Sequence, residues 1–554
     1  MRTGLTRRWS PLMAIGVMAG VFGLTFGSVG CRKPVTTPTA NNKAASAPVT
    51  AQVTEIEDQL KSALYQLQPE NLNIDARLDD AVSVLNNWWA AVEEAGLKPV
   101  GLTPPAIPER RVSEAVRTDL QRDRFDLWDG RAIRAAYLAK AIADQVTEGA
   151  SSDLERIVRV FDWTCRNIAL ESEDVSHRPI TLYELLVIGR GSPADRAWVM
   201  GAVLKQLRWD LVILHVPGAK FADPEAAWLA GVPQGGEIYL FDLRLGLPVP
   251  GASEPGAKDA APPATLSQVL AQPELLQALA ARTDQPFEPG VEQLQTAGVA
   301  VYSEPTSWSP RMWNVEQLLP GESLCVLYEA PDSLGEAPGV FQRVAQLQKH
   351  WSPEQVQLWS YPTEKEAGYR EMDERGRRWI EERIAPFLMP AVIQYDREQR
   401  PVGLTQSMQQ LRIRTDQLSG KRVSAIAQYM TIRQLSVSSP PEPSYGPLYQ
   451  QAADDAFYWS SVCKYESGDL ETAAKSLSDY LKRYRRNGRS VASARSLLAD
   501  CLAAQGKYDD AVQTVRVQES DDPYRARHAV LMRRWTALAG TAATQPAAQA
   551  SPQP

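Results

Sequence analysis

Residues 189–197 decide how the central part of this chain folds, and they read Gly189-Arg190-Gly191-Ser192-Pro193-Ala194-Asp195-Arg196-Ala197. The two glycines interrupt a helical pattern, and Ser192 then offers the side-chain oxygen of a helix N-cap. Pro193 suits the first helical position. Asp195, three residues after Ser192, completes a capping box at the positive end of the helix dipole. The sequence therefore predicts a helix from Ser192 to Leu207.

The elements around this turn are a helix before it and strands after it. Ser152 opens an amphipathic helix whose apolar residues recur on one face through Ile168. Strands are expected at 211–216 and 237–242, and the second has large apolar side chains on both faces. A Pro/Gly/Ala-rich stretch at 248–264 predicts a linker or long loop.

The turn resembles the nucleophile turn of bacterial transglutaminase-like (papain-type) domains, in which a Gly-x-Gly-x-Cys-x-Asp-x-Ala pattern opens a helix. Ala227-Trp228-Leu229 resembles the His-Ala-Trp strand of that family, and Tyr239-Leu240-Phe241-Asp242 resembles the strand that carries its Asp. The resemblance covers about residues 110–250 and implies a papain-like domain.

The residues that would carry the chemistry of this family are largely replaced. The Cys position falls on Pro193 and the His position falls near Ala226, whereas Asp242 keeps the residue type of the family. A thiol nucleophile needs a base within about 3 Å and a third group that orients the base. Acyl transfer by this route has no mechanism here, which predicts a degenerate, non-catalytic domain, a pseudoenzyme.

One alternative keeps catalysis, as a hydrolase or acyl transferase that uses Ser192. Ser192 is adjacent to the nucleophile position of the family, and a helix start can stabilise an oxyanion. His215 would be the base and Asp242 the third group, but His215 lies on a strand that does not match the His of the family. Ser192 is equally explained as a helix cap, and Asp242 as the acceptor of a turn. Cys165 lies on the apolar stripe of its helix, which disfavours it as a nucleophile.

The C-terminal part contains an internal repeat. Gly468 and Gly506 lie 38 residues apart in matching surroundings, and Cys463 and Cys501 fall in the same register, which predicts that both cysteines are small core residues. The pattern resembles tetratricopeptide repeats, with helical hairpins that turn at each glycine. Because two repeats do not bury a continuous core, we expect helices near 404–435 and 524–538 to complete the stack. Such repeats either offer a groove to a protein or peptide partner or pack on the rest of the chain.

The N-terminus has the features of an export signal. Three arginines precede a short apolar stretch at 12–26, which ends in Gly27-Ser28-Val29-Gly30-Cys31. Cys31 resembles the processing site of bacterial lipoproteins, which implies lipidation of Cys31 and a membrane anchor that faces the periplasm. Arg32, by the same resemblance, favours the outer membrane. Plain secretion and an uncleaved anchor are the alternatives.

Composition sets the remaining limits. The 554 residues carry a net charge of −7 without long runs of one sign, which argues against nucleic acid as a partner. The four histidines are scattered and no group has metal-ligand spacing, so we expect no metal and no cofactor.

The predicted fold class is α+β, mostly helical, with a papain-like transglutaminase-type domain and a C-terminal module of α-helical repeats. The expected organisation is a signal peptide (1–30), a lipidated tether (31–54), a helical region with the transglutaminase-like domain (55–250), an α/β middle region (265–440), tetratricopeptide-like repeats (445–540) and a disordered tail (541–554). Within the middle region, a strand is expected at 324–328.

Lipidation can be tested directly in cells that export the chain. A labelled fatty acid should be incorporated into the wild-type chain, and Cys31→Ala should abolish the label because no other residue occupies the processing position. Label that persists in Cys31→Ala would refute the assignment.

Overall fold

The computed structural model describes residues 46–544 apart from 69–70, 72–77, 99–103, 106, 172–177, 217–226, 253–260, 283, 320, 322–323, 350, 389–391, 396–400, 406–409, 436–445, 486 and 517–520. Cys31, Ala226 and the expected signal peptide therefore lie outside the described residues. Residues from Val53 onward form one compact unit. The fold is mostly helical with small sheets, which confirms the α+β class.

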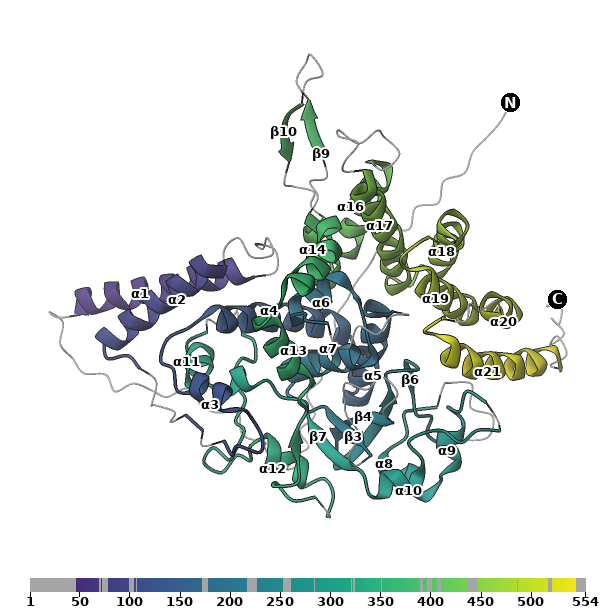
Figure 1. Ribbon diagram of the computed structural model, residues 1–554, viewed down its shortest axis with the longest axis horizontal. Coiled ribbons are helices and arrows are strands. Elements are labelled where there is room, and N and C mark those ends of the chain that lie inside the picture. The colour runs from purple at the N-terminus through teal and green to yellow at the C-terminus, as the bar shows by residue number, and fades with distance from the viewer. Residues whose placement is uncertain are drawn as a thin grey trace, which may run out of the picture. The chain divides into compact units, whose positions relative to one another are not determined.

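The largest sheet has six strands in the order β6-β5-β4-β3-β7-β8 (Figure 1). Their bounds are β3 Val212–His215, β4 Trp228–Gln234, β5 Glu237–Asp242, β6 Leu247–Pro248, β7 Gly298–Val301 and β8 Gln357–Leu358. Neighbouring strands are antiparallel except β7 and β8, which are parallel. The two strands predicted at 211–216 and 237–242 are β3 and β5.

The two faces of this sheet belong to different cores because successive side chains of a strand point to opposite faces. On β3, Ile213 joins the core with α4 (Leu127–Thr147), α5 (Asp153–Asn167) and α7 (Pro193–Gln206). Val212 and Leu214 join the core on the other face, together with α8 (Leu266–Ala271) and α12 (Val340–Ala345). The helices predicted to begin at Ser152 and Ser192 are α5 and α7.

The sheet crosses the boundary that the sequence placed between 55–250 and 265–440. β7 pairs with β3 over its whole length, from Val212 opposite Val301 to His215 opposite Gly298. The stretch at 248–264 leaves and rejoins the same sheet edge, where Pro250 bridges Pro263. The two ranges therefore share one sheet and its cores. The predicted boundary between 55–250 and 265–440 does not separate two domains.

The prediction of a strand at 324–328 is wrong, because these residues do not form one. The backbone N–H groups there are bonded to side chains instead of to a neighbouring strand. Val326 donates to Oε1 of Gln206 at 2.9 Å, and Leu327 and Tyr328 donate to Oε2 of Glu316 at 2.7 and 2.6 Å. An extended segment can satisfy its donors in this way without joining a sheet.

The helical ends of the described chain also differ from the expected tether and tail. α1 begins at Ser46, inside the range 31–54, because the segment continues into a helix that buries Ile56 and Leu60. α21 (Arg525–Thr544) extends past residue 541. Within the part of the chain that the structure covers, none of the helices combines the length and apolar character needed to cross a membrane.

The other elements that precede the C-terminal helices are short or peripheral. They are α2 Leu78–Glu94, α3 Glu114–Leu120, β1 Ala169–Leu170, α6 Leu182–Ile188, β2 Arg190–Gly191, α9 Glu274–Gln277, α10 Val291–Gln295, η2 Pro305–Trp308, α11 Pro310–Leu318, α13 Tyr361–Arg370, α14 Glu374–Leu388, β9 Val392–Tyr395, β10 Pro401–Thr405, α15 Gln410–Leu418 and α16 Arg422–Leu435.

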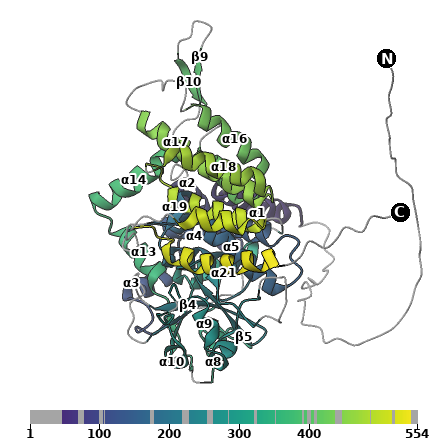
Figure 2. The same ribbon diagram turned by 90° about the vertical axis from the view of Figure 1, so that its right-hand side faces the viewer.

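The C-terminal region consists of successive helical hairpins, α17 Gly446–Glu466 with α18 Leu470–Tyr484, and α19 Val491–Ala504 with α20 Tyr508–Arg516. Gly468 and Gly506 form the turns with φ of +79° and +75°, a conformation that glycine adopts without steric cost. Cys463 and Cys501 are fully buried, as predicted. α16 extends the stack before α17 and α21 extends it after α20, and Figure 2 shows α18, α19 and α21 one below another.

Helix α17 is joined to the turn before α7 by a buried ion pair. The Arg190 guanidinium donates to Asp455, and the two side chains are 3% and 0% exposed. Ser490 accepts a second hydrogen bond from Arg190 at 3.0 Å, and Arg489 donates to the other oxygen of Asp455 at 3.2 Å. A buried pair of this kind stabilises docking only while both charges are present.

Replacing Arg190 tests this contact. Arg190→Met should lower the free energy of unfolding by about 3–5 kcal/mol, because it leaves the buried Asp455 carboxylate without its main partner. Lys140→Met removes a more exposed pair with Asp144 and should cost less than about 1 kcal/mol. Denaturant unfolding of both variants measures the difference, and equal losses would contradict the role of Arg190.

Candidate functional site

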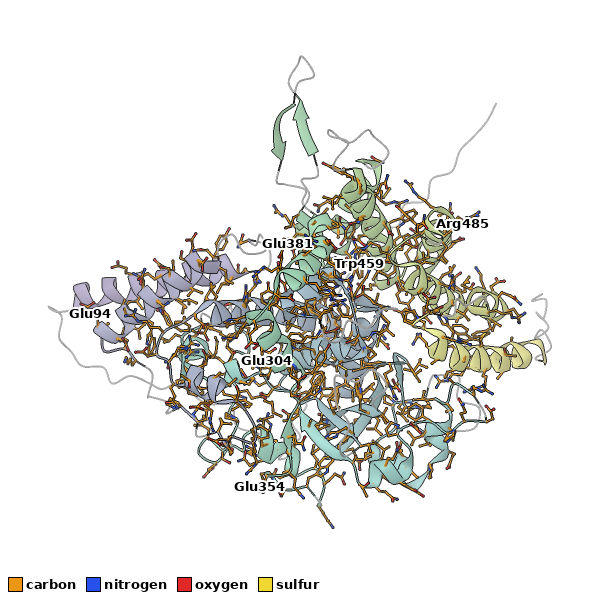
Figure 3. All side chains as sticks on the ribbon, viewed as in Figure 1. Glu94, Glu304, Glu354, Glu381, Trp459 and Arg485 are labelled. Atoms are coloured by element: carbon orange, nitrogen blue, oxygen red, sulfur yellow. The ribbon has the colours of Figure 1, made fainter. Side chains whose placement is uncertain are left out.

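The two glycines of the turn before α7 are both required by close contacts. Gly189 has φ of +65°, and a Cβ there would lie 2.5 Å from the ring of Trp459 on α17. Figure 3 shows Trp459 on the inner side of α17, away from Arg485 at the end of α18. A Cβ on Gly191 would lie 2.6 Å from Oδ2 of Asp195. The glycine pattern therefore allows α17 and the Asp195 carboxylate to approach the backbone.

Ser192 is held in a capping box at the start of α7. Its Oγ donates to Oδ2 of Asp195 at 2.9 Å and accepts from the Asp195 backbone N–H at 3.2 Å. The Tyr361 hydroxyl lies 3.2 Å from Oγ and donates to Oδ1 of Asp195 at 2.9 Å. The hydroxyl proton of Ser192 is therefore directed to a carboxylate or a phenol, and no imidazole among the described residues hydrogen-bonds to it.

His215 lies at the end of β3, in a different environment. Nδ1 is 3.2 Å from the carbonyl oxygen of Val216, and the ring packs against Gly298, where a Cβ would lie 2.8 Å from Cε1. Burial lowers the pKa of His215, so that the neutral ring is favoured. The structure does not bring this ring into hydrogen-bond contact with Ser192.

Asp242 closes the turn that follows β5. The carboxylate is fully buried, and Oδ1 accepts from the backbone N–H groups of Arg244 at 2.8 Å and Leu245 at 2.9 Å. Oδ2 accepts from the Arg244 guanidinium at 2.8 Å. These contacts account for Asp242 as a turn acceptor, without a histidine to orient.

A cavity of about 280 Å³ lies beside the turn that follows β5. There, this turn and α5 face α17, α19 and α21. Its wall combines charged and aromatic side chains from elements far apart in the sequence. The charged ones are Asp162, Arg166, Arg196, Asp500 and Arg527, and the aromatic ones are Tyr458, Tyr465, Tyr524 and Trp535. Guanidinium groups gathered on a cavity wall can bind an anionic group of a ligand.

Two guanidinium groups meet at Gly246 on this wall. A Cβ on Gly246 would lie 3.2 Å from Nη1 of Arg196 and 3.3 Å from Nη1 of Arg527. Arg196 donates to the carbonyl oxygens of Ile168, Leu243 and Cys165 at 2.8–3.0 Å. No ion pair joins it to a carboxylate in the described parts of the chain.

Arg527, by contrast, is bound to acid and backbone together. Its Nη2 lies 3.2 and 3.0 Å from the two carboxylate oxygens of Asp500, and its Nη1 donates to the carbonyl oxygens of Leu245 and Gly246. Asp500 is on α19 and Arg527 is on α21, so this pair joins the repeats to the turn after β5.

Asp162 and Arg166 lie one helical turn apart on α5 and line both this cavity and a neighbouring one of about 380 Å³. No hydrogen bond joins the Asp162 carboxylate to another residue that the structure covers, and burial raises its pKa. The Arg166 guanidinium lies 5.3 Å from the centroid of the Tyr465 ring and makes no hydrogen bond to any described residue. These two side chains therefore keep polar atoms without a hydrogen-bond partner among the described residues.

The cavity also exposes a thiol, that of Cys165. Burial raises its pKa to about 11, so the thiolate is scarce at neutral pH. The described part of the chain contains no group of three or more His, Cys, Asp and Glu side chains that could hold a metal ion. The arrangement is suited to binding charged groups and lacks a paired nucleophile and base.

No protein-family model, curated protein or solved structure matches this chain. The sequence singled out the turn itself but not the partners that surround it. Tyr361 and Asp455 lie more than 160 residues from the turn, and no local pattern connects them to it. Arg196 belongs to the stretch 189–197 and lines the cavity. Its place in that stretch is the one sequence feature that points to the cavity.

Thiol reactivity tests the absence of an activated nucleophile. In a Cys31→Ser chain at pH 7.5, iodoacetamide should label each of the remaining four cysteines at least about 100-fold more slowly than in the unfolded chain, because burial raises the pKa of each. Mass spectrometry locates the label. For Cys165 the rate should rise as the pH approaches about 11, and fast labelling at neutral pH would contradict the assignment.

Proposed function

We propose that this chain is a membrane-anchored bacterial lipoprotein that binds a protein or peptide at the cell envelope through a degenerate transglutaminase-like domain and tetratricopeptide-like repeats. The observation that carries the non-catalytic part is the hydrogen bonding of Ser192. Its hydroxyl caps α7 through Asp195 and contacts Tyr361, while Pro193 stands at the nucleophile position of the resembled family. A serine nucleophile requires a base on that hydroxyl.

The contacts of the repeats indicate where a ligand would bind. The Arg414 guanidinium lies 3.6 Å from the centroid of the Trp459 ring on α17. The Tyr524 hydroxyl accepts hydrogen bonds from the Leu170 backbone N–H at 2.8 Å and from Arg196 at 3.4 Å. The repeat region is therefore partly covered by α15, β1 and α7 of the chain itself. The cavity beside Gly246 is an open space at this contact, and it supports binding there.

The membrane part of the proposal rests on the N-terminal sequence. Lipidation at Cys31 would anchor the chain facing the periplasm, and Arg32 favours the outer membrane. A binding protein on a lipid anchor needs neither a cofactor nor a metal for this role.

An assay with amide, ester and transamidation substrates tests the non-catalytic proposal. The purified mature chain should show no turnover above a blank. Ser152→Ala is a matched control for Ser192→Ala, because Ser152 also caps a helix through the backbone N–H of Glu155. Turnover that Ser192→Ala abolishes and Ser152→Ala retains would establish the alternative hydrolase or acyl transferase.

A photo-crosslinking side chain tests the binding proposal in envelope extracts. Placed at Tyr465 on the cavity wall, it should capture one dominant envelope protein or peptide. Placed at Tyr65 on α1, which is 59% exposed, it should not capture the same species. Identical products at both positions, or no product at Tyr465, would contradict a partner at the cavity.

A further inference from the structure

The charges on the cavity wall are not balanced. Three guanidinium groups face two carboxylates, and Asp500 is already bound on both oxygens by Arg527. Among the described residues, no ion pair is formed by Arg166, Arg196 or Asp162. The cavity therefore offers two cations and one anion to a ligand.

Arg196 is the main reason to expect an anionic ligand in the cavity. Its side chain is 1% exposed, yet its hydrogen bonds go to carbonyl oxygens and to the Tyr524 hydroxyl. A buried cation is costly unless an anion neutralises it. A ligand anion in the cavity would supply that charge, and guanidinium groups bind carboxylates and phosphates with matched geometry.

The acids on the wall distinguish among anions. Asp162 and Asp500 would repel the double charge of a phosphate, whereas a carboxylate brings a single charge. Asp162 also accepts no hydrogen bond from any described residue, so its carboxylate can receive one from an amino or amide N–H of the ligand. A ligand with a carboxylate and a nearby N–H group matches this wall.

We propose that the cavity binds the free carboxylate end of a small peptide, with the carboxylate at Arg166 and Arg196 and an N–H group at Asp162. This inference rests on the proposed function and names the ligand class of the same site. A volume of about 280 Å³ suits a ligand of dipeptide size. The second cavity, which shares Asp162 and Arg166, gives space for the rest of a longer peptide.

Calorimetric titration of the mature chain with the dipeptide Ala-Ala and with its C-terminal amide tests the carboxylate. The free acid should bind at least about tenfold more tightly, since the amide lacks the charge that the arginines recognise. Tetra-alanine distinguishes the source of the carboxylate. Tighter binding than Ala-Ala assigns the site to the end of a longer chain, and equal binding assigns it to a free dipeptide.

Arg166→Gln tests the assigned residue. Arg166 makes no hydrogen bond to the described protein, so the variant should remain folded, with a cooperative thermal transition, while its affinity for Ala-Ala falls about tenfold. Arg156→Gln is the matched control, because Arg156 lies on the same helix α5 and pairs with Asp153. Its affinity should not change.

Three results would overturn the proposal. They are no binding of Ala-Ala to the wild-type chain, equal binding of the acid and the amide, and inorganic phosphate that binds as tightly as Ala-Ala. If Tyr465 still crosslinks one envelope species in any of these cases, this ligand assignment fails while the proposed partner binding stands. If the crosslink at Tyr465 is absent and Ala-Ala binds, the proposed partner binding fails while the ligand assignment stands.

Discussion

The buried pair of Arg190 and Asp455 is the interaction on which the rest of the structure depends. Arg190 sits between the two glycines that open α7, and Asp455 sits on the first long helix of the repeats. A buried charge is costly without a partner, so this pair favours one position of α17 relative to the turn. With α17 in this place, Trp459 fits against Gly189, and the later repeat helices reach α5 and the turn after β5.

The same turn is a packing element. Two glycines, a capping serine and an aspartate shape the start of α7, and the Asp195 carboxylate is bound by Ser192 and Tyr361. The next arginine, Arg196, is directed to carbonyl oxygens at the cavity wall. In our proposal the turn holds the repeats in place and shapes a binding cavity.

Local features could be predicted from the sequence because a few neighbouring residues determine them. The capping box of Ser192 and Asp195 and the glycine turn at Gly468 are complete within four residues. The pairing of β7 with β3, the contact of Tyr361 with Ser192 and the Arg190–Asp455 pair join distant segments, so no local period reveals them. The segment at 324–328 has strand-like composition, but side chains of other helices take its N–H groups.

Native-state hydrogen exchange tests the central claim that the turn, the sheet and the repeats form one cooperative unit. Amide protection in α17 and α7 should be lost at the same low denaturant concentration, with the same opening free energy, because the buried pair couples the two helices. Amides of α17 to α21 that open at clearly lower denaturant than those of α7 would contradict the account, since the repeats would then unfold independently of the turn.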